Sequence, residues 1–545
     1  MLDPSAYADS FARDNLPPPE LWPALEADLP ELAYPKRLNA AVELLDRMVE
    51  SGFAARPCIR SSGGAVWSYA ALLDKANRIA AILADEMGVL PGNRVLLRAA
   101  NTPMLAACWF AVLKAGAIAV TTMPLLRARE LGYVLDKARI GFALCDASLA
   151  EELTAAKAAQ AFRTVYFHTD AADGLEARMA RRSGSFVNVV LSHDDVAVIG
   201  FTSGTTGRAK ATMHFHRDVL AICDLFPRSI LKPAADDIFS GTPPLGFTFG
   251  LGGMLLFPMR FGASTLLLER ATPDSLLEAV GRHRVTTLFA PPTMYRAMTD
   301  LAPAHDLSSL KACVSAGEFL PAPILEGWRD ATGITIIDGL GSTEMFHIFI
   351  AAAGADVRPG ATGKAVPGYR AMIFDDDMRP APIGTVGRLG VRGPTGCRYL
   401  ADPERQREYV RDGWNLTGDA YRMDDDGYFW FQARTDDMIV SAGYNISGAE
   451  IEAVLLEHPA VRECAVIAAP DPERGHIVKA CVVLKEHGAA GEDMTKALQE
   501  FVKAQIAPYK YPRAVEYVAA LPRTETGKVQ RFILRANDAE KPSRI

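Results

Sequence analysis

Short apolar runs of strand length alternate with helix-length segments through much of this chain, and this alternation restricts its fold more than any other feature. Buried strands are predicted at 118–122, 142–145, 165–167 and 196–201. Helices are predicted at 103–114, where Thr102 and Pro103 suit a helix start, and between strands at 131–138 and 149–161. Strands that alternate with helices of this length predict a mostly parallel sheet covered by helices.

The region after about Asp437 repeats this alternation on a smaller scale. Ser447 and Glu450 have capping-box spacing, so a helix is expected to begin there and to end before Pro459. Strands are predicted at 464–468, 480–484 and 515–518, and a helix around 498–506. The alternation predicts the α/β fold class, which becomes α+β when the whole chain is considered. Because 545 residues are too many for one core, we also predict two domains. A large domain with parallel-rich sheets and flanking helices comes first, and a small α+β domain follows from about Asp437.

Composition excludes several classes of protein. The net charge of −7 leaves no basic surplus to neutralise the phosphates of a nucleic acid. The 8 cysteines form no C-x-x-C pair, which argues against zinc sites and a disulfide framework. The longest apolar run, 104–113, is too short to span a bilayer, and residues 1–14 do not resemble a signal peptide. We expect a cytoplasmic protein without membrane or nucleic-acid partners, either a monomer or a homodimer.

The segment that follows the strand at 196–201 concentrates hydroxyls and glycines just ahead of Lys210. Its members are Thr202, Ser203, Gly204, Thr205, Thr206 and Gly207. Glycines let backbone amides turn towards an anion, hydroxyls add donors, and lysine adds a positive charge. The segment therefore predicts a polyphosphate cradle, although its spacing is not that of a Walker A loop. Composition alone leaves open an ordinary surface turn.

Four further segments follow in a fixed order: 339–344 (Gly-Leu-Gly-Ser-Thr-Glu), 417–419 (Thr-Gly-Asp), 434–439 (Arg-Thr-Asp-Asp-Met-Ile) and 522–528 (Pro-Arg-Thr-Glu-Thr-Gly-Lys). With the hydroxyl-rich loop, they make nearly the whole chain resemble the adenylate-forming superfamily of acyl-CoA synthetases, adenylation domains and luciferases. The resemblance implies an ATP-dependent acid–thiol ligase that uses ATP, Mg²⁺ and coenzyme A. Such an enzyme joins a carboxylic acid to AMP, releases pyrophosphate, and then transfers the acyl group to coenzyme A.

The resemblance also assigns residues to the nucleotide. Thr205, Lys210, Glu344 and Lys528 would be catalytic, with Glu344 and Thr205 holding Mg²⁺ against the charge of the phosphates. The residues implied to bind ATP or AMP are Thr202, Ser203, Gly204, Thr206, Gly207, Ala316, Gly317, Glu318, Asp338, Gly339, Leu340, Gly341, Ser342, Thr343, Asp419, Phe431 and Arg434. Asp419 has two acceptor oxygens for the ribose hydroxyls. Plainer interpretations remain: a helix-terminal acid at Glu344, an acid in a polar turn at Asp419 and a surface ion pair at Arg434.

The same resemblance implies a large domain at residues 1–435 and a small mobile α+β domain at residues 436–545. Asp436 would be the hinge, and Ser441, Ala442, Gly443 and Tyr444 would line the channel for coenzyme A once the domain has rotated. Lys528 would stabilise the charge that develops during adenylation, and it resembles a target of a lysine acetyltransferase and deacetylase. From composition alone, Lys528 is a solvated lysine and 441–443 a tight turn.

Two segments indicate an aromatic acid. Residues 344–349 and 244–253 resemble the benzoate-CoA ligase branch, and the second is most like enzymes for 2-aminobenzoate. The implied acid-binding residues are Phe247, Ala316, Gly339, Gly341, His347 and Ile348. Small residues would let a flat ring slide against backbone, while Phe247 and Ile348 pack on it. His347 would hydrogen-bond the acid, or else it is a satisfied core histidine.

Some positions depart from the family pattern, and two other functions stay open. Ala209 replaces a usual proline, Ala211 a frequent glycine, and Leu340 the aromatic residue that stacks on adenine. His214 and His216 alternate in sequence, but no third metal ligand lies nearby, so we assign them to structural support. One alternative is a stand-alone adenylation enzyme that loads a carrier protein. The other is an ATP-binding sensor without chemistry, against which the complete charged set argues.

Overall fold

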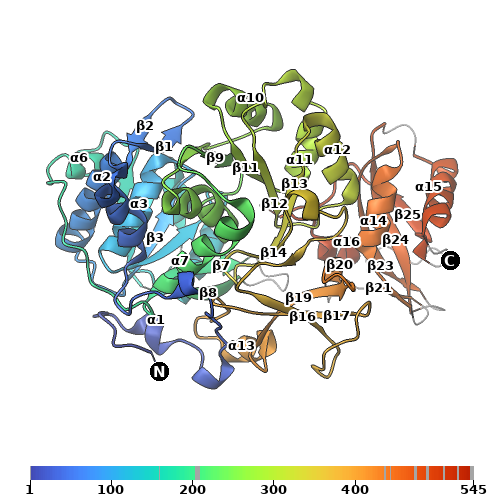
Figure 1. Ribbon diagram of the computed structural model, residues 1–545, viewed down its shortest axis with the longest axis horizontal. Helices are drawn as coiled ribbons and strands as arrows, with labels where there is room; N and C mark the ends of the chain where they lie inside the picture. The colour runs from blue at the N-terminus through green and yellow to red at the C-terminus, as the bar shows by residue number, and fades with distance from the viewer. Residues whose placement is uncertain are drawn as a thin grey trace.

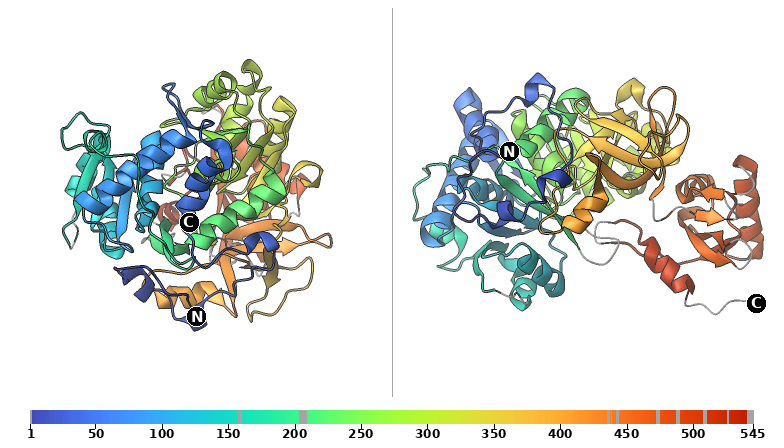
Figure 2. Two further views of the ribbon diagram at one scale, coloured as in Figure 1. Left: turned by 60° about the vertical axis from the view of Figure 1, so that its left-hand side comes forward. Right: turned by 90° about the horizontal axis from the view of Figure 1, so that it is seen from below.

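The structure is a computed structural model of the 545-residue chain. It describes residues 2–156, 158, 160–202, 209–434, 437, 439–441, 444–471, 475–486, 490–506, 510–524 and 527–539. Two parallel-rich sheets with flanking helices form most of the molecule, and a third, antiparallel sheet lies below them in Figure 1. The C-terminal elements form a separate lobe, which Figure 2 shows standing beside the rest.

The first sheet has six strands in the order β6-β5-β3-β4-β7-β8. Their bounds are β3 Arg94–Arg98, β4 Ile118–Thr122, β5 Phe142–Asp146, β6 Arg163–Phe167, β7 Val196–Thr202 and β8 Lys210–Phe215. All neighbours are parallel except β7 and β8, which pair antiparallel at the edge. The four predicted strands are confirmed. β3 and β4 are buried at every position, as expected for central strands of a sheet covered on both faces.

The second sheet has nine strands in the order β15-β14-β13-β12-β11-β9-β10-β1-β2. Their bounds are β1 Pro57–Ser61, β2 Val66–Ser68, β9 Ile238–Gly241, β10 Ser264–Leu267, β11 Thr287–Ala290, β12 Ala312–Ala316, β13 Ile336–Gly341, β14 Ile348–Ala351 and β15 Lys364–Ala365. The six strands from β13 to β1 in this order run parallel, and β2, β14 and β15 are antiparallel edges. One apolar cluster, which includes Leu97, Phe289 and Ile348, joins this sheet to the first.

The helices of the large part are α1 Phe11–Asp14, α2 Tyr69–Ala81, α3 Pro103–Lys114, α4 Ala128–Lys137, α5 Ala150–Ala155, α6 Leu175–Met179, α7 His216–Asp224, α8 Thr248–Leu251, α9 Phe257–Arg260, α10 Pro273–His283, α11 Pro292–Thr299, α12 Ala322–Thr332 and α13 Pro403–Tyr409. The predicted start of α3 is confirmed: the hydroxyl of Thr102 accepts a hydrogen bond from the Leu105 amide at 3.2 Å. The helix predicted at 149–161 is too long, since α5 ends at Ala155. Only Leu153 of α5 is buried, so no apolar stripe extends the helix by packing.

The third sheet pairs β16 Arg370–Phe374, β17 Val386–Arg392, β18 Val410–Arg411, β19 Trp414–Met423 and β20 Phe429–Arg434. Every pair in it is antiparallel. β19 and β20 carry Asp419 and Arg434 at directly opposed positions. This register places the Asp419 carboxylate beside the Arg434 guanidinium.

The C-terminal lobe has its own apolar cores, drawn from residues 439–534. Its elements are β21 Ile439–Ser441, β22 Tyr444–Ile446, α14 Gly448–Glu457, β23 Val461–Asp471, β24 Gly475–Leu484, α15 Glu492–Gln505, β25 Ala514–Tyr517 and α16 Arg531–Ala539. The prediction of a separate C-terminal domain is confirmed. The boundary at 435/436 stays a prediction, because both residues lie outside the described ones.

The start of α14 follows half of the predicted capping box. The hydroxyl of Ser447 accepts a hydrogen bond from the Glu450 amide at 3.2 Å, as expected. The Glu450 carboxylate instead accepts hydrogen bonds from the ammonium of Lys510 at 2.6 and 2.7 Å. The ion pair offers the carboxylate a stronger, charge-assisted donor than the Ser447 amide.

All 8 cysteines are free thiols, which confirms the absence of a disulfide framework. Among the described residues, no helix has the length and apolar character needed to cross a membrane.

Two buried histidines make stability depend on pH. Burial lowers the pKa of His214 to about 4 and of His216 to about 3, against the opposing influence of Asp218. In the unfolded chain both protonate near pH 6.5, so between about pH 6.5 and 4 the unfolded state binds more protons. Stability therefore falls as pH falls through this window, by about 1.4 kcal/mol per pH unit for each histidine.

Replacing His216 by asparagine is expected to reduce by one the number of protons taken up on unfolding, and so to weaken the dependence of stability on pH. The Nδ1 atom of His216 accepts a hydrogen bond from the Ala40 amide at 3.1 Å, and an asparagine oxygen can accept the same bond. Denaturation midpoints of both proteins between pH 5 and 7 should show a shallower slope for His216→Asn. Parallel slopes would contradict a neutral, buried His216.

Candidate active site

The nine-stranded sheet brings four of the predicted small and apolar residues together at one end. Ala316 lies opposite Gly339 on neighbouring parallel strands, and Gly341 lies opposite Ile348 on antiparallel ones. The absence of a side chain at Gly339 is required, because an added Cβ would lie 2.5 Å from Cδ1 of Ile348. The prediction that these positions share one site is supported by their register, although they are up to 32 residues apart in sequence.

Glu344 lies in the turn between β13 and β14 and is buried. Its Oε1 atom accepts a hydrogen bond from the hydroxyl of Tyr399 at 2.7 Å. No other described residue donates to this carboxylate. A buried carboxylate with one oxygen that no described residue occupies is a hard oxygen ligand of the kind that Mg²⁺ prefers, so the site fits this cation. Within the same turn, the Ser342 hydroxyl accepts a hydrogen bond from the Met345 amide at 3.1 Å.

Asp419 and Arg434 form an ion pair across the third sheet. The Nη1 atom of Arg434 donates to Oδ1 of Asp419 at 2.8 Å and to the Thr417 carbonyl at 3.3 Å. Asp419 is buried, whereas the Arg434 side chain is 42% exposed. The guanidinium thus orients the Asp419 carboxylate, and the predicted roles of both residues toward the ribose stay predictions.

Lys528 lies in a tight turn that approaches the large part of the molecule. The Thr524 amide donates to the Lys528 carbonyl at 2.7 Å, and Gly527 adopts a left-handed φ of 88°. An added Cβ at Gly527 would lie 3.8 Å from Oε1 of Glu318, so the turn closes against that residue. Although Lys528 keeps an exposed surface, the surrounding protein and the charge of Arg434 lower the pKa of its ammonium, against the opposing effects of Glu318, Asp419 and Glu344. Its neighbours are thus the other predicted nucleotide residues.

Several predicted nucleotide residues lie around this cluster. Burial raises the pKa of Glu318, and Arg523 and Lys528 oppose that shift. Burial also raises the pKa of Asp338 well above its usual range, so this carboxyl group favours its protonated form. Phe431 stacks on Phe319 with ring centroids 5.3 Å apart.

The remaining nucleotide residues are placed by the strands and turns already described. Thr343 presents its carbonyl to His214, and Leu340 is half-buried opposite Ile350. Gly317 has a left-handed φ of 92°, and a Cβ atom added to it would have no described atom within 4 Å. Thr202 and Lys210 pair across the ends of β7 and β8, at the base of the hydroxyl-rich loop. The Lys210 ammonium lies 5.8 Å from the centroid of the Tyr399 ring.

His347 lies in an aromatic cage near the predicted acid-binding residues. The rings of Phe257 and Phe249 have centroids 4.5 and 5.8 Å from that of His347. Gly252 makes room for the imidazole, since an added Cβ there would lie 2.3 Å from its Cδ2 atom. Burial lowers the pKa of His347 to about 3, so the ring is neutral at physiological pH. Phe247 is half-buried and immediately precedes α8, the helix that carries Phe249.

The hydrogen bonds of His347 are incomplete. Its Nε2 atom lies 3.3 Å from the Phe249 carbonyl oxygen, to which only a protonated nitrogen can donate. In a neutral ring Nδ1 is then the acceptor. Nδ1 is buried, and no described residue hydrogen-bonds to it. His347 is therefore not a fully satisfied core histidine.

Some predicted residues lie outside the described part of the chain. They are Ser203, Gly204, Thr205, Thr206 and Gly207 of the hydroxyl-rich loop, the hinge residue Asp436, and Ala442 and Gly443. Of the predicted coenzyme A residues, Ser441 and Tyr444 pair at the ends of β21 and β22. Their predicted role, like the others in this site, stays a prediction.

The structure adds residues that the sequence reasoning missed. Tyr399 binds Glu344 across 55 positions, the hydroxyl of Tyr409 lies 3.5 Å from that of Ser342, and Phe319 faces Phe431. The sequence offers one signal for Phe319, its position directly after Glu318. For the two tyrosines the sequence offered no signal, because Tyr399 lies in the connection after β17, where it bridges to Thr212 of β8, and Tyr409 ends α13, both far in sequence from the turn after β13.

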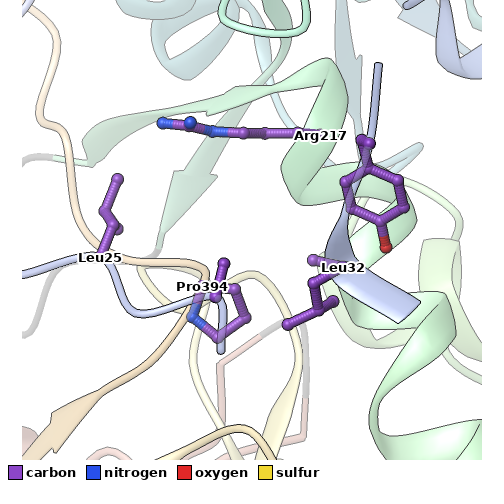
Figure 3. A pocket seen from close by; sticks show the side chains of 7 residues that line it. Leu25, Leu32, Arg217 and Pro394 are labelled. Atoms are coloured by element: carbon purple, nitrogen blue, oxygen red, sulfur yellow. The ribbon is translucent and has the colours of Figure 1, made fainter. Parts of the chain in front are cut away.

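A small cavity lies elsewhere, between the N-terminal segment and α7 (Figure 3). It has a volume of about 90 Å³ and is lined mainly by apolar side chains, with Arg217 at its edge. Ligand pockets for small molecules begin at roughly 300 Å³, and none of the predicted site residues lines this cavity.

Comparison with known proteins assigns the family. The profile of the AMP-binding enzyme family matches residues 49–399, and that of the AMP-binding enzyme C-terminal domain matches residues 450–528. Benzoate–CoA ligase from Thauera aromatica is 33% identical over 514 residues, which cover 93% of this chain and 97% of the relative. The human mitochondrial acyl-coenzyme A synthetase ACSM3 is 32% identical over 535 residues, with coverage of 93% and 91%.

Solved structures of similar proteins support the same family. The anthranilate CoA ligase AuaEII in complex with anthranoyl-AMP superposes with a TM-score of 0.88 at 32% identity, covering 94% of this chain and 99% of that one. A benzoate CoA ligase from Burkholderia xenovorans LB400 gives 0.84 at 31% identity, covering 91% and 100%. Fold and site thus define an AMP-forming acid–thiol ligase, a class of enzyme that uses ATP, Mg²⁺ and coenzyme A. The chain belongs to the AMP-binding enzyme family.

Proposed function

We propose that this chain is an aryl-CoA ligase that converts 2-aminobenzoate, or benzoate, into its coenzyme A thioester through an acyl-AMP intermediate. The observation that carries the choice of acid is the neutral, buried His347 with its unpartnered Nδ1 atom. Such an atom needs a hydrogen-bond donor, which the amino group ortho to the carboxylate of 2-aminobenzoate can supply. The relatives named for benzoate and anthranilate support the aromatic class.

The pocket proposed for the ring is apolar and flat. Gly339 and Ile348 would form one wall at the sheet end, with Ala316 and Gly341 leaving backbone exposed to the ring. Phe247 would pack on the other side. An aromatic ring gains most from such a narrow slot, whereas a long acyl chain would meet the aromatic cage that Phe249 and Phe257 form around His347.

In the first half-reaction, a carboxylate oxygen of the acid attacks the α-phosphorus of ATP, and pyrophosphate leaves. We assign Asp419 to the ribose hydroxyls, with Arg434 as a neighbouring donor, and Lys528 to the developing charge. Lys210, beside Tyr399, and the hydroxyl-rich loop would hold the phosphates. Mg²⁺ bound by Glu344 and Thr205 would neutralise part of the phosphate charge. The approach of the Lys528 turn to Glu318 supports an arrangement suited to this step.

In the second half-reaction, the sulfur of coenzyme A attacks the acyl carbon and AMP leaves. We propose that the small domain first rotates about Asp436, which withdraws Lys528 and brings residues 441–444 to the channel for coenzyme A.

The acid is tested by pyrophosphate release with ATP, Mg²⁺ and coenzyme A across benzoate, 2-aminobenzoate, hydroxybenzoates, acetate and octanoate. We expect the highest kcat/KM for 2-aminobenzoate or benzoate. In His347→Leu, the preference for 2-aminobenzoate over benzoate should fall by about tenfold, the value of one buried hydrogen bond. His216→Asn, which alters a buried histidine outside the pocket, should keep the wild-type ratio.

Higher kcat/KM for acetate or octanoate than for either aromatic acid would overturn the aryl-CoA ligase. An unchanged ratio in His347→Leu would leave the aryl class standing and reject the role of His347.

A further inference from the structure

The Glu344 carboxylate is oriented by a single hydrogen bond from the described residues, and that bond comes from Tyr399. The donor is a neutral phenol, so it fixes the carboxylate without cancelling its charge. Tyr399 is 1% exposed, so its hydroxyl is shielded from bulk solvent. Only one carboxylate oxygen is occupied in this way.

Tyr399 is itself held on two sides. Its amide donates to Oε1 of Gln406 at 2.9 Å, and its ring packs edge-on against Tyr409 with centroids 5.8 Å apart. Gln406 is fully buried and donates in turn to the carbonyls of Leu21 and Cys397. The phenol hydroxyl therefore has little freedom to follow a moving carboxylate.

The backbone around Glu344 is clamped from neighbouring segments as well. The Thr395 hydroxyl donates to the Met345 carbonyl at 2.7 Å, and Nε2 of His214 lies 2.8 Å from the Thr343 carbonyl oxygen. Phe346, which has a left-handed φ of 72°, stacks on the His214 ring at 4.2 Å. With the backbone fixed on both sides, the remaining freedom of Glu344 lies in its side chain, which is the part that Tyr399 holds.

We propose that Tyr399 is a positioning residue for the divalent cation: it presets the Glu344 carboxylate so that its open oxygen meets the cation bound with ATP. The inference rests on the proposed function, since it takes Glu344 as the metal ligand. Partners that orient a ligating carboxylate typically contribute 10- to 100-fold to metal affinity. Tyr399 is not expected to touch the substrates.

The test measures ATP binding by calorimetry without any acid, at increasing Mg²⁺, so that no turnover occurs. In Tyr399→Phe, the Mg²⁺ concentration that half-saturates the gain in ATP affinity should rise by about tenfold or more. ATP affinity in EDTA should stay unchanged. Tyr69→Phe is the matched control, because Tyr69 is equally buried and its hydroxyl donates to the Ala263 carbonyl at 2.8 Å, away from this site.

A double-mutant cycle with Glu344→Gln separates a positioning role from a structural one. Glu344→Gln alone should raise the Mg²⁺ requirement, and adding Tyr399→Phe should raise it little further. An unchanged Mg²⁺ requirement in Tyr399→Phe, or equal effects of Tyr399→Phe with and without Glu344→Gln, would overturn the inference. If Glu344→Gln itself leaves the Mg²⁺ requirement unchanged, the assignment of Glu344 in the proposed function fails first.

Discussion

Replacing Lys528 by alanine is expected to slow acyl-AMP formation by about 10²- to 10³-fold, while the transfer of a preformed acyl group from AMP to coenzyme A stays close to the wild-type rate. The physical reason is that only the first half-reaction builds new negative charge at the α-phosphate. The Lys528 turn lies against Glu318, and the pKa of Lys528 responds to Asp419 and Glu344. These neighbours agree with the role in adenylation that we propose for its charge.

Two half-reaction assays check this expectation. Pyrophosphate release without coenzyme A reports adenylation, and thioester formation from chemically prepared acyl-AMP reports transfer. Lys485→Ala, an exposed lysine of the same lobe, should change neither rate. Equal losses in both half-reactions would contradict the assignment of Lys528 to adenylation alone.

The pH dependence of the same variant is a second readout. Desolvation and Arg434 lower the pKa of Lys528, so its charge is lost at a lower pH than that of an ordinary lysine. Adenylation should therefore fall as pH rises through that pKa, and this alkaline limb should be missing in Lys528→Ala. Acetylation of Lys528, which we propose as a means of regulation, would remove the same charge at every pH.

The second large effect is on stability and concerns the ion pair between Asp218 and Arg398. Both side chains are fully buried, and Nη1 of Arg398 donates to Oδ2 of Asp218 at 2.7 Å. Asp218→Asn would leave a buried guanidinium without a counter-charge, which costs about 3–5 kcal/mol. The asparagine can still accept the hydrogen bond that the Phe215 amide makes to Asp218 at 2.9 Å. The stability lost in Asp218→Asn therefore measures the effect of removing the negative charge, separately from that hydrogen bond.

Chemical denaturation of the large domain should show this loss as a lower midpoint. The double variant Asp218→Asn/Arg398→Met should recover most of the stability, because it removes both charges together. Glu43→Gln, which breaks the exposed pair with Arg47 at 2.7 Å, should cost less than about 1 kcal/mol. A cost for Asp218→Asn as small as that for Glu43→Gln would contradict a buried, charged pair.

Local sequence predicted the elements best where burial is complete. β4 matches its predicted bounds because a short run of apolar and β-branched residues, buried at every position, suits a strand covered on both faces. α5 was predicted too long, since alanine-rich sequence favours a helix while the end of that helix depends on what it packs against. Glu450 shows the same limit, because its partner Lys510 is 60 positions away.

In the candidate site, too, residues within a local motif could be predicted, whereas residues that depend on tertiary packing could not. Motifs within one segment, such as 339–344, could be read directly, and the register of β12, β13 and β14 then gathers them. The contact of Tyr399 could not be predicted, because the connection after β17 reaches Glu344 only once it is bridged to Thr212 of β8, which no local pattern encodes. The incomplete hydrogen bonding of His347 likewise appears only once the Phe249 carbonyl is in place.

The most direct test of the central claim is product analysis of one reaction with ATP, Mg²⁺ and 2-aminobenzoate, before and after coenzyme A is added. We expect acyl-AMP and pyrophosphate to appear first in amounts near that of the enzyme. Addition of coenzyme A should then give the thioester and AMP at continuous turnover. ADP and phosphate in place of AMP and pyrophosphate, or no thioester after coenzyme A is added, would contradict the account.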